Sequence, residues 1–218
     1  MLEDREPRPM LTEGSIEQVE RVAAVIDALL ADQRTPAAVR MFYDPATQFA
    51  GDTFLSLAPN NPQSISPADL LAVTLLTVAP GAVAVRALLP GGQIADQVSE
   101  LLTMIPADVP LWDATDLDLV RADILWNLLK TTAGVGPTIA GKVLARKRPE
   151  LIPIVDRVVA DRLECAAGTY WTTFRRVLQH PGRRALIAAL RPDQPILRIL
   201  DTTMWMHWRR GGPNSVLA

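Results

Sequence analysis

Residues 124–163 read ILWNLLKTTAGVGPTIAGKVLARKRPELIPIVDRVVADRL, and they indicate the architecture more clearly than any other segment. A helical pattern precedes Gly134-Val135-Gly136, and a second helix is expected from Pro137. The two glycines allow backbone conformations barred to other residues and leave room for a large anion. Because proline suits the first turn of a helix, the free N–H groups there would point outward and bind a phosphate. An ordinary helical corner closed by a glycine is the structural alternative.

Cations follow on the second helix of this hairpin. Lys142, Arg146 and Lys147 lie along the helix and at its end. Since the backbone of DNA attracts positive charge, we expect these three side chains to contact phosphates.

Asp156 follows the apolar pair Ile154-Val155 at the expected start of another helix. Aspartate is favoured at a helix N-cap for structural reasons alone, so this residue by itself indicates no more than a cap. Its position twenty residues after Gly136 makes the combined pattern more specific.

A two-glycine hairpin, a second helix, a short turn and Pro153-x-Val155-Asp156 together resemble the helix-hairpin-helix DNA glycosylase superfamily. The resemblance is strong over about 40 residues. It implies that the hairpin holds the backbone of double-stranded DNA and that the aspartate is the catalytic carboxylate at a flipped nucleotide. The DNA-binding residues implied are Gly134, Val135, Gly136, Thr138, Lys142, Arg146, Lys147 and Arg157.

Departures from the family pattern refine this expectation. Bifunctional members carry a lysine where this chain has Thr138, so we expect a monofunctional enzyme that uses water and has no lyase activity. Lys142, one turn further on, could replace that lysine, but a phosphate contact is the favoured interpretation. The single cysteine, Cys165, excludes a cysteine-ligated iron–sulfur cluster, and we expect no metal and no cofactor.

Apolar periodicity and helix start signals predict an all-α fold of nine or ten short helices. We expect one helix-hairpin-helix glycosylase-like unit over 1–218, with two helical lobes and a cleft between them. Its parts would be an N-terminal helix (15–31) and a long irregular connection within 1–65, a helical barrel lobe over 66–165 with the hairpin at 124–148, and C-terminal helices over 166–218. The later helices are expected at 66–78, 94–105, 118–130, 138–148, 156–166, 171–179, 183–190 and 195–208. A further short helix is expected between the break at Pro80-Gly81 and Leu89.

The composition is that of a chain with ample material for a core, 49% hydrophobic and 21% charged residues. The polar N-terminus is unlike a signal peptide, and no apolar run is long enough to span a membrane. We therefore expect a cytoplasmic monomer, associated with the nucleoid when bound to DNA.

Residues 1–120 hold 6 Lys/Arg against 17 Asp/Glu, and residues 121–218 hold 16 against 7. The halves could present one basic face, or neutralise each other across an interface.

Cleavage of an N-glycosidic bond places positive charge on the sugar, which a fixed carboxylate stabilises. The base must first leave the stack for a pocket of aromatic and apolar groups. Candidates for this pocket are Tyr43, Asp44, Phe49, Trp112 and Trp126. The target would be a damaged base, or a modified base in phage DNA. The alternatives are a non-catalytic helix-hairpin-helix DNA-binding module and a module that docks on an acidic protein.

Overall fold

The computed structural model describes residues 11–154, 156–166 and 168–209. This part of the chain is all-helical, with twelve α-helices, one 3-10 helix and no strand. The expected all-α class is therefore confirmed. No helix within the described ranges combines the length and apolar character needed to cross a bilayer.

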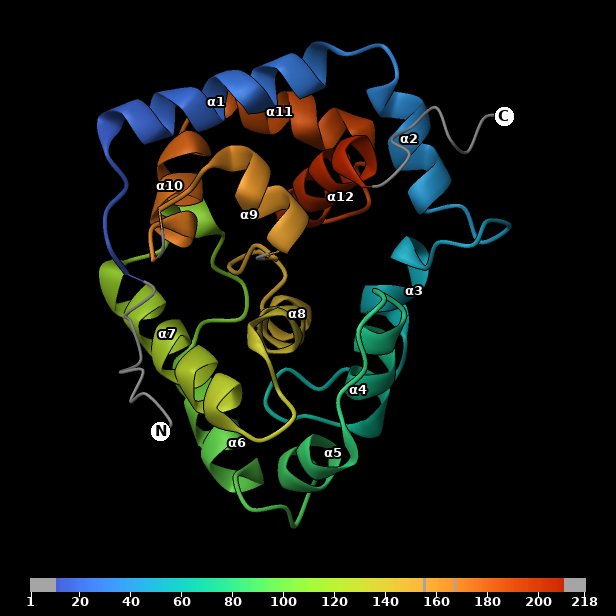
Figure 1. Cartoon of the computed structure of the whole chain (residues 1–218), viewed down its shortest axis with the longest axis vertical. Coiled ribbons are helices and arrows are strands. Elements are labelled where there is room, and N and C mark those ends of the chain that lie inside the picture. Colours follow the sequence, from blue (N-terminus) through green and yellow to red (C-terminus); the bar gives the residue numbers. More distant parts are fainter. Residues whose placement is uncertain (1–10, 155, 167, 210–218) are drawn as a thin grey trace, which may run out of the picture.

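One group of helices comes from both ends of the chain and occupies the upper part of Figure 1. Within it α1 packs on α10, and α12 packs on α2, α9 and α11. Val22 and Ile26 give α1 a fully buried stripe. Its members are α1 (Ile16–Ala31), α2 (Thr35–Phe42), α9 (Arg157–Leu163), α10 (Tyr170–Val177), α11 (Pro181–Leu190) and α12 (Ile196–Trp208).

The second group is continuous in sequence and occupies the lower part of Figure 1. Its central helix, α8, packs against α7 on one side and α4 on the other. Every residue of α8 from Ile139 to Lys147 is buried. The members are α3 (Gly51–Ser56), α4 (Pro67–Thr74), α5 (Ala82–Leu88), α6 (Ala95–Met104), α7 (Asp116–Thr131) and α8 (Pro137–Lys147). The short η1 (Leu111–Asp113), between α6 and α7 in sequence, packs on α10 of the first group.

Local caps explain why several helices begin where they do. Ser66 and Asp69 form a reciprocal capping box ahead of α4, which confirms the start expected at Ser66-Pro67. The spacing of Ser15 and Gln18 predicts a capping box at the start of α1; Ser15 is the N-cap and accepts from the Gln18 N–H, but the Gln18 side chain does not reach back to it. The Gln18 amide instead donates to the hydroxyls of Thr169 and Thr173, each at 2.6 Å, and so ties α1 to α10.

The connection over 32–65 is more regular than expected, because α2 forms within it in addition to α3, which lies where the sequence predicts a short turn of structure, around Thr53 to Leu57. Short helices of this kind are marginal on their own and depend on packing. Ala38 and Val39 of α2 are buried, and α2 packs against α12, which lies more than 150 residues later. Since this contact is not local, the periodicity of two turns was too weak a signal to predict α2.

Candidate functional site

The hairpin joins α7 to α8 through a turn at residues 132–136. Gly134 has φ +82°, a conformation that side chains disfavour, so glycine is required there. Val135 is buried and anchors the turn in the core. Gly136 is the N-cap of α8, and nothing lies within 4 Å of the point where a Cβ would stand. The exposed backbone of Gly136 and the first turn of α8 therefore form an open helix start.

Asp156 is the N-cap of α9, as the sequence indicates. Its Oδ1 accepts a hydrogen bond from the N–H of Val158 at 2.9 Å. The side chain is half-buried and borders a cavity of about 330 Å³. The aspartate is thus fixed by its own helix start while it remains open to a ligand.

Residues far apart in sequence line this cavity. Gly51, Phe54 and Leu55 come from α3 and its start, and Lys142 from α8. The remaining lining residues are Phe42, Tyr43, Gln48, Phe49, Ala50, Leu75, Leu76, Thr77, Ile154, Asp156, Val159, Gln194, Arg198, Asp201, Thr202, Trp205 and Arg209. The cavity therefore receives residues from both helix groups.

Three aromatic rings in contact form one wall. Phe42 stacks on Phe49 with centroids 5.7 Å apart, and Trp205 meets both rings edge-on at 5.9 and 6.0 Å. The guanidinium of Arg209 lies 5.0 Å from the centre of the Phe49 ring. A flat apolar ligand with polar edges would suit this wall.

Charged groups form another part of the lining. Lys142 Nζ donates to the Leu76 carbonyl at 2.6 Å, and burial lowers the pKa of its amine. Asp201 pairs with Arg198 at 2.9 Å, and burial raises the pKa of the Asp201 carboxyl to about 6. Within the described ranges, no three His, Cys, Asp or Glu side chains gather as a metal-type cluster.

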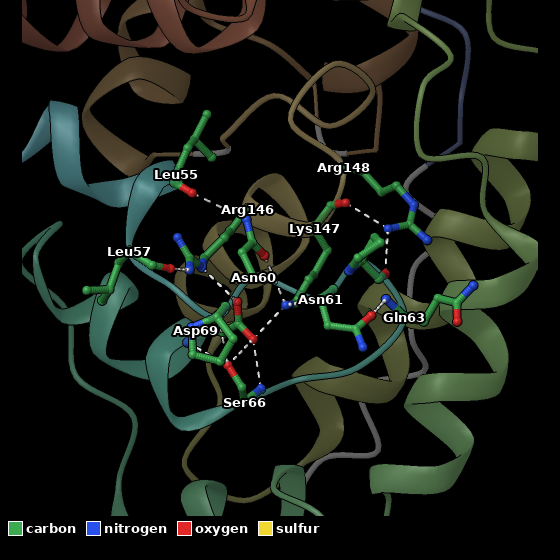
Figure 2. A network of polar contacts seen from close by, with 12 residues as sticks. Leu55, Leu57, Asn60, Asn61, Gln63, Ser66, Asp69, Arg146, Lys147 and Arg148 are labelled. Carbon is green, nitrogen blue, oxygen red and sulfur yellow. Dashed lines mark hydrogen bonds and ion pairs between the residues drawn. The ribbon is translucent and has the colours of Figure 1, made fainter.

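The structure contradicts the expected phosphate contacts of Arg146 and Lys147. Both side chains are fully buried and pair with Asp69, at 2.7 and 2.6 Å. Arg146 also donates to the carbonyl of Phe54. In Figure 2, Arg146 donates to the carbonyl of Leu57, and Lys147 donates to the carbonyl of Asn61. These cations hold the segment that follows α3 in sequence against α8, so they cannot reach DNA. Lys142, which is also buried, belongs to the cavity wall instead.

The expected base-pocket residues divide into two sets. Tyr43 and Phe49 line the cavity. Asp44 is exposed and accepts from the N–H of Ala46 within its own turn, so it belongs to the surface. Trp126 is buried in the core beneath Lys130, and Trp112 lies beneath Arg184. Neither tryptophan lines the cavity.

Thr138 and Arg157 are the remaining residues expected to bind DNA. Thr138 is half-buried in the first turn of α8. Arg157 begins α9, but its side chain lies outside what the structure describes, as does the whole of Val155.

Several ion pairs join the basic second half of the chain to the acidic first half. Arg175 pairs with Asp116 at 2.6 Å and Arg183 with Asp27 at 2.7 Å. Together with the buried contacts of Asp69, these pairs support mutual neutralisation, the second interpretation of the asymmetry.

Sequence reasoning missed Phe42, Gln194, Arg198 and Asp201 as cavity residues. The spacing of Arg198 and Asp201, one turn apart on a predicted helix, was an available signal for an ion pair. Nothing in the sequence placed that pair beside Asp156.

The comparisons with known proteins give one match. The searches of the curated proteins and of the solved structures found no match. Residues 36–208 match a protein family of unknown function, which spans most of the chain and all the cavity-lining residues except Arg209. The chain therefore belongs to the family of unknown function DUF6308.

Proposed function

We propose that this protein is a helix-hairpin-helix DNA glycosylase that hydrolyses the N-glycosidic bond of a flipped base and leaves an abasic site. The observation that carries the proposal is that Lys142, from the second hairpin helix, and Asp156 line the same cavity. In this proposal the two helix groups are the two lobes, and the cavity is the part of their cleft that receives the base.

DNA would approach on the side of the open helix start. The N–H groups at Gly136 and the first turn of α8 would bind one backbone phosphate. Extrusion of one nucleotide would bring its base against Phe42, Phe49 and Trp205.

Asp156 would act on the sugar. As the C–N bond breaks, positive charge develops on the sugar ring, and a fixed carboxylate nearby stabilises it. The same carboxylate can orient and deprotonate the attacking water. Because the Val158 N–H holds one oxygen of Asp156, the second oxygen is available to the ring or to the water.

We propose a monofunctional reaction, since the hydroxyl of Thr138 stands where a lyase needs an amine. Water then completes the hydrolysis. The target would be a damaged base, in repair, or a modified base of phage DNA, in defence.

A base-release assay tests this function. The protein is incubated with duplexes that carry a panel of damaged bases and with genomic DNA from phages whose cytosines are modified, and abasic sites are then revealed by alkali. The control is Asp156→Asn, because asparagine caps a helix as well as aspartate does.

Alkali-dependent breaks with the wild-type protein and none with Asp156→Asn are expected. Breaks without alkali would show a lyase amine and overturn the monofunctional assignment. Salt-sensitive DNA binding without any base release would instead support a non-catalytic DNA-binding module.

A further inference from the structure

Arg198 is a buried cation with unused hydrogen-bonding capacity. Only 4% of its surface is exposed, although it borders the cavity. Its Nη2 donates to the Ile152 carbonyl at 2.5 Å and pairs with Asp201 at 2.9 Å. Its Nε and Nη1 are buried and have no hydrogen-bond partner within the described part of the chain. Because unsatisfied buried donors are costly, this guanidinium is suited to an acceptor that is absent from the free protein.

A second unsatisfied group lies just before the start of α12. Gln194 also lines the cavity, and its Oε1 is buried without a hydrogen-bond partner among the described residues. Arg198 lies in the first turn of α12 and Gln194 directly precedes the Pro195 N-cap, so the start of this helix brings donors of Arg198 and an acceptor of Gln194 to the same cavity. Neighbouring acceptor and donor groups are what the polar edge of a nucleobase presents.

A cation beside the departing base would assist the reaction proposed above. When the C–N bond breaks heterolytically, its electron pair stays on the ring nitrogen of the base, while the sugar becomes positive. The base therefore departs as an anion until it takes a proton from water. Asp156 can stabilise the sugar, but its negative charge cannot stabilise the departing base.

We propose that Arg198 is a catalytic residue that hydrogen-bonds the departing base and stabilises its negative charge, while Gln194 accepts from a donor on the same base. This inference rests on the proposed glycosylase function. Asp201 is the positioning residue, since it holds the guanidinium from one turn further along α12.

The test compares two leaving groups. Single-turnover base release is measured on the panel base that the wild-type protein releases fastest and on its ring-fluorinated analogue, whose released N–H is more acidic. Arg198→Gln should slow release of the ordinary base by about 10²–10³-fold, as the loss of a preorganised donor does. The loss should be clearly smaller for the fluorinated base, which needs less help to leave.

Arg191→Gln is the matched control. Arg191 is a nearby arginine whose Nε pairs with Asp193 at 2.8 Å and whose guanidinium stacks on Tyr43, but it does not line the cavity. Its replacement should reduce the rate of release only slightly, and by the same factor for both bases. If Arg198→Gln does not fold, Arg198→Lys keeps the charge and should give an intermediate loss with the same dependence on the leaving group.

If Arg198→Gln lowered the release rate of both bases by the same factor, Arg198 would have only a structural role. That result would overturn the inference and leave the glycosylase function in place. Failure of the wild-type protein to release any base would overturn the proposed function, and the assignment of Arg198 with it.

Discussion

The carboxylate of Asp201 accepts a hydrogen bond from the backbone N–H of Ile154 at 3.1 Å. Arg198, its ion-pair partner, holds the carbonyl of Ile152. The segment that leads to Asp156 is therefore fixed by the last helix of the described chain. The position of the proposed catalytic carboxylate depends on α12 as much as on its own helix.

Asp201 should make stability depend on pH. Burial raises its pKa to about 6 from an ordinary value of 3.8, so the folded protein binds this proton more tightly than the unfolded chain does. The resulting stabilisation is complete below about pH 4 and is lost as the pH rises through 6, at about 1.4 kcal/mol per pKa unit. Relative to the wild type, Asp201→Asn should gain stability over this window.

Urea unfolding at a series of pH values from 4 to 7 measures this difference. Asp96→Asn, which replaces an exposed carboxylate, is the control and should run parallel to the wild type. A constant difference between Asp201→Asn and wild type across the window would contradict the raised pKa.

Asp156 should show separable roles in capping and in chemistry. Asp156→Ala removes the hydrogen bond to Val158 and should cost about 0.5–2 kcal/mol of stability, whereas Asp156→Asn keeps the cap. Both changes should abolish base release. Thermal denaturation measured beside the release assay checks this, and full activity in a stable Asp156→Asn protein would remove the aspartate from the mechanism.

The two hairpin glycines should respond differently to alanine. Gly134→Ala forces a side chain into a φ of +82° and should cost about 1–2 kcal/mol. Gly136→Ala meets open space at an ordinary φ, so stability should be kept while the added methyl group hinders the phosphate. Unfolding curves and DNA affinity at two salt concentrations distinguish these effects. Unchanged affinity in Gly136→Ala would count against a phosphate at the hairpin.

Asp69 should be a stability residue without a direct role in DNA binding. Its replacement by asparagine leaves Arg146 and Lys147 as buried cations without a counter-ion, which typically costs about 3–5 kcal/mol. Asp44→Asn, at an exposed turn, is the matched control and should change neither stability nor base release. Denaturant unfolding provides the measurement, and a fully stable Asp69→Asn protein would show that the network in Figure 2 contributes little.

Local signals determined much of this protein. The Ser66-Pro67 start, the glycine hairpin and the cap at Asp156 depend on backbone groups within a few residues, so the sequence alone was enough to place them. The all-α class followed from periodicity repeated over many helices, which averages out local errors.

Tertiary packing decided the rest. The charges of Arg146 and Lys147 predict surface positions when only the neighbouring sequence is considered. In the structure α4 and α7 cover α8 on both sides, and both cations form ion pairs with Asp69. The cavity likewise brings Asp156 together with Phe42, more than 100 residues earlier, and with Arg198 and Asp201, more than 40 residues later. These long-range contacts depend on which helix faces pack together. A helical sequence pattern shows that a face is apolar, but it does not show which element covers that face.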